Sequence, residues 1–143
     1  GRGALFIYKQ VAPNSWSEFD KVAPGDLNEG DTFGFSVSIE GSTALVGARN
    51  AFLAGKTNAG AAYIYEIPGG EIGDAVFKQR LTATIPEEDG FYGQSVELND
   101  EYMVIGSPSP NSVGSVYFYY PGNDGSWELS ERVLPTNPAG STT

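Results

Sequence analysis

The 143-residue sequence contains no cysteine and no histidine. The first absence excludes disulfides, thiolate nucleophiles and zinc–thiolate sites, and the second excludes imidazole bases, Ser–His triads and histidine metal sites. Basic residues are also scarce, with 8 Lys and Arg against 18 Asp and Glu, so the net charge is −10. Nucleic acid is not expected as a partner, because phosphate contacts need clustered Lys and Arg. Cationic partners are favoured instead.

Long apolar runs are missing as well. No stretch approaches the roughly 18 residues of a membrane span, and no signal peptide is visible. The first residue is Gly1 rather than Met, which favours a processed, trimmed or partial chain. Apolar residues nowhere follow a helical spacing over three turns, so we expect almost no helix. The sequence does contain 19 Gly and 9 Pro between short runs of Val, Ile, Tyr, Phe and Thr, which is typical of many short antiparallel strands.

Self-comparison of the sequence reveals an internal repeat with offsets of 54 to 59 residues. A Gly-Ala-Leu-Phe-Ile-Tyr motif at 3–8 returns in similar form at 60–65 and 114–119. A Phe-Gly-Phe-Ser-Val motif at 33–37 returns as Tyr-Gly-Gln-Ser-Val at 92–96. An Ala-Leu-Val-Gly-Ala motif at 44–48 returns as Met-Val-Ile-Gly-Ser at 103–107. Several motifs in one order at one period indicate a repeated structural unit.

These motifs predict ten strands that form four-stranded antiparallel meanders. The expected strands are 3–9, 16–22, 34–40, 43–48, 60–66, 77–83, 93–99, 102–107, 114–120 and 127–133. The shortest links allow only tight hairpins, and a four-stranded meander at this period is the blade of a β-propeller. We therefore predict an all-β fold of about two and a half propeller blades. The expected division is the second half of a blade at 1–24, complete blades at 25–84 and 85–134, and a linker or tail at 135–143.

The same motifs resemble those of a known family. Phe33-Gly34, the strand 44–48 and the strand 60–65, together with their second copies, are similar to the FG-GAP repeat of integrin-α-type β-propellers. The resemblance implies an extracellular or cell-surface propeller, usually of seven blades, that acts in adhesion, ligand binding or assembly. Many family members carry a calcium loop between the first two strands, but here 40–43 and 98–101 are too short to wrap an ion that needs about six to eight oxygens. No metal site and no cofactor are therefore predicted.

A binding surface is expected where the longer loops gather. Successive turns of a meander alternate between its two ends, so the loops 49–59 and 108–113 should share one face with the acidic loops 26–31 and 87–90. We predict that this face binds cationic or hydroxyl-rich partners. Its candidate contacts are Asp31, Glu87 and Asp89, with Phe52 and Leu53 as an exposed apolar anchor.

Other interpretations of these features stay open. Acidic loops also keep a Gly-rich β-protein soluble without any partner. Weak calcium binding by Asp26, Asn28 and Asp31 is a further alternative, because alternating oxygens resemble half of an ion loop. Trp16 and Trp127 could stack on sugars, but their repeated position predicts that they pack between strands.

The function favoured by these features is a non-enzymatic, extracellular adhesion or structural module whose partner is a protein or a glycan. Glycosidase catalysis requires two carboxyl groups opposed across a cleft. Glu87, Glu88 and Asp89 are instead adjacent on one loop, so an enzyme is not expected. A carbohydrate-binding module is the alternative on the same scaffold. Closed propellers need about four to eight blades. The chain is therefore either a segment of a longer propeller or a subunit that other copies complete as a ring or filament.

Overall fold

The structure is a computed structural model, and it describes residues 1–69 and 74–136. Its strands are β1 (Leu5–Ala12), β2 (Ser15–Val22), β3 (Phe33–Glu40), β4 (Thr43–Ala48), β5 (Ala61–Glu66), β6 (Val76–Leu81), β7 (Ser95–Leu98), β8 (Met103–Ser107), β9 (Ser115–Pro121) and β10 (Trp127–Val133). In these two ranges no helix is long and apolar enough to cross a membrane. Most of the expected tail, from residue 137 onward, lies outside the described residues.

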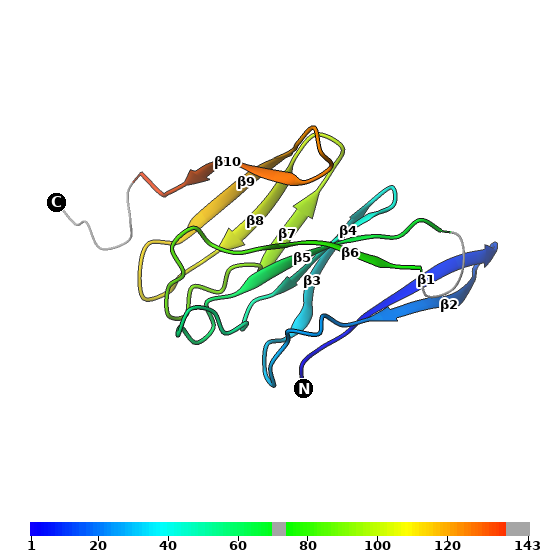
Figure 1. Cartoon of the computed structure of the whole chain (residues 1–143), viewed down its shortest axis with the longest axis horizontal. Coiled ribbons are helices and arrows are strands. Elements are labelled where there is room, and N and C mark those ends of the chain that lie inside the picture. The colour runs from blue at the N-terminus through cyan, green and yellow to red at the C-terminus, as the bar shows by residue number, and fades with distance from the viewer. Residues whose placement is uncertain (70–73, 137–143) are drawn as a thin grey trace.

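The strands form three antiparallel sheets that follow one another along the chain (Figure 1). We call the β1–β2 pair unit 1, the β3–β6 sheet unit 2 and the β7–β10 sheet unit 3. In units 2 and 3 every strand pairs with its neighbour in sequence, which makes each unit a four-stranded meander. The predicted all-β fold of antiparallel meanders is confirmed.

The three strands whose predicted start was the glycine of the Gly-Ala-type motif, β1, β5 and β9, begin after that glycine. β5 starts at Ala61, and the preceding Gly60 forms an isolated parallel bridge to Tyr92 of unit 3. Gly60 has a φ of +87°, and a Cβ there would overlap the main chain of Tyr92. The equivalent Gly3 makes the same bridge to Phe33 of unit 2. These glycines therefore serve the contact between units, because the backbone of the next unit passes directly against them.

The hydrophobic core lies between units rather than within a single sheet. Side chains of β4 alternate between two clusters, as expected for a strand that is covered on both faces. Val46 belongs to the cluster between units 1 and 2, together with Phe33 and Tyr63. Leu45 belongs to the cluster between units 2 and 3, together with Ile105. Each fully buried Leu, Ile or Val side chain stabilises the fold by about 1.5–3 kcal/mol, so the units stabilise one another.

The two tryptophans differ in their surroundings. Trp127 packs against the cluster between units 2 and 3, as expected. Trp16 is largely exposed, so the expectation that it packs between strands is wrong for this chain. The physical reason is that Trp16 lies on unit 1, and among residues 1–69 and 74–136 no other unit covers that side of its sheet.

Candidate functional site

The loops that join units and the longer loops within units gather at one end of the sheets. We call this surface the loop face and define it by the four loops 23–32, 49–60, 82–94 and 108–114. In Figure 1 the β2–β3, β4–β5 and β8–β9 loops lie along the lower edge, opposite the tight β3–β4 and β7–β8 turns. The expected placement of these loops on a common face is seen in the structure.

Asp31 fastens two of these loops together. Its carboxylate accepts the main-chain N–H of Asn28 at 2.7 Å, within its own loop, and that of Phe52 at 3.3 Å, in the next loop. The residue is only 4% exposed. A buried carboxylate needs such donors to replace the water it has lost. Asp31 therefore positions Phe52, and a direct contact between Asp31 and a partner stays a prediction.

Phe52 and Leu53 take different positions in the loop 49–60. Phe52 is 52% exposed, while Leu53 is partly buried. Leu53 and Lys56 exchange two main-chain hydrogen bonds, of 3.2 and 2.9 Å, which close a small turn directly after Phe52. The aromatic side chain is thus held on a loop that is fixed on both sides, by Asp31 and by this turn.

Asp89 fastens the loop 82–94 to the longer loops of units 2 and 3. Its carboxylate accepts hydrogen bonds from Nδ2 of Asn58 at 2.8 Å and from Nδ2 of Asn111 at 3.1 Å. Its main-chain N–H donates to the carbonyl of Thr57 at 3.0 Å. The neighbouring Glu88 accepts the main-chain N–H of the same threonine at 3.1 Å. The acidic loop therefore acts as a connector, and Asn58 and Asn111 are site residues that sequence reasoning missed.

Glu87 forms an ion pair with Arg132 of β10, with an N–O distance of 3.6 Å. The Arg132 guanidinium also lies 5.6 Å from the ring centroid of Tyr117. Both Glu87 and Arg132 are partly shielded from solvent, so this pair is screened less than an open surface pair. The Glu87 carboxylate is therefore paired with a residue of unit 3. Its contact with a binding partner stays a prediction.

Unit 2 repeats this arrangement with different residues. Arg80 pairs with Asp26 at 3.1 Å and lies 5.6 Å from the ring centroid of Tyr63. Burial is the main cause that raises the pKa of Tyr63, and the nearby Asp26 carboxylate raises it further. Sequence reasoning missed both arginines. A signal was available in the sequence, because an arginine directly precedes the last apolar residue of β6 and of β10, as Arg80-Leu81 and Arg132-Val133.

The calcium alternative gains no geometric support from these contacts. Asp26 faces Arg80, and Asp31 is occupied by two main-chain amides. Among residues 1–69 and 74–136 no group of three or more acidic side chains is arranged to hold a metal ion.

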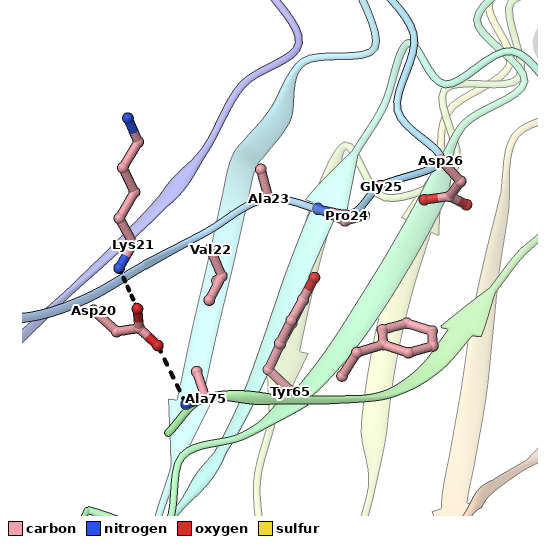
Figure 2. Close-up of a pocket in the computed structure, with 10 residues that line it drawn as sticks. Asp20, Lys21, Val22, Ala23, Pro24, Gly25, Asp26, Tyr65 and Ala75 are labelled. Carbon is pink, nitrogen blue, oxygen red and sulfur yellow. Dashed lines mark hydrogen bonds between the residues drawn. The ribbon is translucent and has the colours of Figure 1, made fainter. Parts of the chain in front are cut away.

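A groove of about 640 Å³ lies between unit 1 and unit 2 (Figure 2). The chain from Asp20 to Asp26 forms one wall, and Tyr65, Ala75 and Phe77 form the other. In Figure 2 the Tyr65 side chain extends toward Pro24, and the Asp20 carboxylate accepts the main-chain N–H groups of Lys21 and Ala75. Aromatic rings beside carboxylates are the kind of surface that recognises sugars or cations.

Comparison with known proteins identifies one stretch of the chain. Residues 16–65 match the FG-GAP repeat. The match begins with Trp16 in β2 and ends with Tyr65 in β5, so it spans the joint between units 1 and 2 and includes the Asp31–Phe52 contact. No curated protein was found to match the chain. The chain thus contains an FG-GAP repeat at residues 16–65, within an all-β fold whose antiparallel four-stranded sheets are consistent with FG-GAP propeller blades.

Proposed function

We propose that the chain is a non-enzymatic binding module of the extracellular space or cell surface, which holds a protein or glycan partner on its loop face. The observation that carries this proposal is the fastening of successive loops by Asp31 and Asp89, which leaves the Phe52 side chain exposed on a fixed backbone. A preformed surface loses little conformational entropy when it binds, so more of the contact energy remains as affinity.

The loop face combines an exposed aromatic side chain with acidic side chains on neighbouring loops. Phe52 is a large exposed aromatic, and the neighbouring loops carry the exposed carboxylates of Glu29 and Glu88. An apolar anchor within a polar rim is the usual arrangement of a binding hot spot. The net charge of −10 favours a partner with cationic or hydroxyl-rich groups around an apolar pocket.

The absence of catalysis is supported by how the acidic side chains are used. Glu87 pairs with Arg132, Glu88 accepts a main-chain N–H, and Asp89 accepts two asparagine amides. Paired-carboxylate hydrolysis needs two carboxyl groups that face each other across the substrate, one of them protonated. Here the three neighbours instead connect loops. The extracellular location rests on the family resemblance alone.

The test uses the labelled full chain on arrays of extracellular proteins and of glycans. We expect a partner whose signal is lost in Phe52→Ala and kept in Val11→Ala. Val11 is a matched control, because it is an exposed apolar residue at the far end of β1. A signal that survives Phe52→Ala, or no signal on either array, would contradict binding through the loop face.

A second candidate function, a carbohydrate-binding module, is favoured by the groove of Figure 2. Phe77 is half exposed there, and its ring lies 5.9 Å from that of Tyr65. The same glycan array separates the two functions. Loss of a glycan signal in Phe77→Ala, with no loss in Phe52→Ala, would assign sugar binding to the groove and not to the loop face.

A further inference from the structure

The first joint, between units 1 and 2, and the second joint, between units 2 and 3, share the same hydrogen bond. Strand pairing puts Asp20 of β2 and Gln79 of β6 at equivalent positions. The Asp20 side chain accepts the main-chain N–H of Ala75 at 3.2 Å (Figure 2), and the Gln79 side chain accepts that of Trp127 at 2.8 Å. The pairing of β6 with β5 and of β10 with β9 gives the same alignment. Ala75 and Trp127 therefore occupy the same place in the two joints.

The side chain at this place decides whether a joint is filled. Trp127 packs against the cluster between units 2 and 3, which includes Tyr119. The corresponding Tyr65 of the first joint lines the groove of about 640 Å³ together with Ala75. Unit 1 carries a tryptophan at this position as well, Trp16, so unit 2 differs from both other units. An indole ring fills the second joint, whereas the methyl group of an alanine leaves the first joint open.

The walls of this groove suit a planar ring. The rings of Tyr65 and Phe77 meet edge to face with centroids 5.9 Å apart, and Phe77 is half exposed. Val22 and Pro24 supply apolar surface on the opposite wall. Aromatic rings in such edge-to-face contacts gain about 0.5–1.5 kcal/mol beyond the burial of their surface. The groove volume lies within the range of about 300–1,000 Å³ that is typical of ligand sites, so residues beside the ring also find room.

The groove also carries a negative charge. The Asp20 carboxylate accepts the main-chain N–H groups of Lys21 at 2.7 Å and Ala75 at 3.2 Å, and both donors are uncharged. Within residues 1–69 and 74–136 Asp20 forms no ion pair, and the Lys21 ammonium lies instead 5.1 Å from the ring centroid of Phe6. The other carboxylate of the groove, Asp26, already pairs with an arginine of β6. A cation brought into the groove therefore meets an unpaired carboxylate at Asp20.

We propose that the groove between units 1 and 2 holds a tryptophan side chain of a partner protein, in a segment where lysine or arginine flanks the tryptophan. The indole ring lies beside Tyr65 and Phe77, at the place that Trp127 fills in the second joint. The flanking cation lies beside the Asp20 carboxylate. The comparison of the joints identifies the occupant, because the chain itself places an indole ring in the equivalent surroundings. Phe52 does not line the groove, so this site is additional to the proposed contact on the loop face.

The test measures binding of short peptides to the full chain by isothermal titration calorimetry. The probe is an acetylated tripeptide amide with tryptophan between two lysines. One matched peptide has alanine in place of tryptophan, and the other has glutamate in place of both lysines. We expect the Lys-Trp-Lys peptide to bind at a single site, and each matched peptide to bind at least about tenfold more weakly.

Ala75→Trp tests the place of the indole ring. This substitution fills the groove from within, as Trp127 fills the second joint, so we expect it to weaken binding of the Lys-Trp-Lys peptide by at least about tenfold. Circular dichroism checks that the variant folds. Val76→Trp is the matched control, because Val76 is exposed, lies outside the groove and faces the other side of the sheet. It should leave the affinity unchanged.

Asp20→Gln tests the charge. Glutamine is the residue at the equivalent position of unit 2, where it accepts the same main-chain hydrogen bond, so the variant keeps this contact and loses only the charge. The preference for the lysine peptide over the glutamate peptide should fall to about twofold. Glu101→Gln removes the same charge from the exposed β7–β8 turn and should keep the preference. An unchanged preference in Asp20→Gln would overturn the contact between the cation and this carboxylate.

The remaining outcomes separate this proposal from other uses of the groove. No binding of the Lys-Trp-Lys peptide, equal binding of the alanine peptide, or binding that survives Ala75→Trp would each overturn it. Equal losses in Ala75→Trp and Val76→Trp would do the same. A glycan signal lost in Ala75→Trp, without any peptide binding, would assign the groove to sugars. Peptide binding should be unchanged in Phe52→Ala, so none of these outcomes bears on binding through the loop face.

Discussion

Tyr92 and Tyr119 share a hydrogen bond of 2.7 Å between their hydroxyl groups, inside the cluster that joins units 2 and 3. Tyr119 lies in β9 of unit 3 and Tyr92 in the loop that leads into β7, and Tyr92 is completely buried. Unit 2 has Phe33 at the position of Tyr92, so this pair distinguishes the second joint from the first. A polar pair in an apolar cluster is stable only while each hydroxyl satisfies the other.

We expect Tyr92→Phe and Tyr119→Phe each to lower the free energy of unfolding by about 1–3 kcal/mol, because each leaves one buried hydroxyl unpaired. The double variant should cost less than the sum of the two, since it removes both hydroxyls and keeps the ring packing. Urea denaturation of the three variants measures this coupling. Additive losses would show that the two hydroxyls do not depend on each other.

Stability should also fall at alkaline pH. Burial is the main cause that raises the pKa of Tyr92 well above 10.0, and the neighbouring Tyr119 raises it further. In the unfolded chain the same tyrosine ionises near pH 10.0, whereas the folded chain keeps it neutral. The unfolded state therefore releases this proton first, so the contribution of Tyr92 to the free energy of unfolding does not change well below pH 10 and decreases as the pH rises above about 10.

Urea denaturation between about pH 8 and about pH 12 measures this decrease. Burial also raises the pKa values of Tyr63, Tyr65 and Tyr119, so several groups contribute to the slope. Tyr92→Phe removes one of them and should show a shallower decrease than the unsubstituted chain. An equal slope in both proteins would contradict the assignment of this pKa shift to Tyr92.

The strands could be predicted from the sequence because their signal is local and repeated. Alternation of apolar residues and tight turns located all ten strands, and the period grouped them into meanders. The starts of β1 and β5 could not be predicted, because Gly3 and Gly60 before them are fixed by the backbone of the following unit. That contact joins residues far apart in the chain, and no local pattern encodes it.

The candidate site shows the same limit at the level of side chains. An acidic residue in a loop reads as a solvent-facing contact, yet Asp31 is buried by a second loop that supplies the N–H of Phe52. Arg80 and Arg132 sit in strands, where the sequence suggests solvent-facing charge, but each lies over a tyrosine ring. Loop placement was predictable from the meander, whereas the pairing of particular side chains depends on how loops meet in space.

Because Asp31 connects the loops 23–32 and 49–60, its removal should make these loops more flexible. Asp31→Ala leaves the main-chain N–H groups of Asn28 and Phe52 without their acceptor, so we expect a loss of about 1–3 kcal/mol in stability. Hydrogen exchange at the Phe52 amide should become faster.

Glu29→Ala is the control for this substitution. Glu29 lies in the same loop and pairs with the N-terminal amine while largely open to solvent, so its removal should change stability by less than about 0.5 kcal/mol. Equal effects of the two substitutions would show that Asp31 acts only through its charge.

The joint between units 2 and 3 can be tested at a single backbone position. Gly60→Ala introduces a methyl group where the main chain of Tyr92 passes, at a φ of +87° that L-residues rarely adopt. Gly125→Ala meets the same unfavourable φ, here +82°, but no atom lies within 4 Å of the added carbon. The second substitution should cost about 1–2 kcal/mol from the backbone alone. The first adds a steric clash that only separation of the two units can relieve, so we expect a clearly larger loss of thermal stability. Similar losses in thermal unfolding experiments would mean that the parallel bridge between Gly60 and Tyr92 does not form in solution.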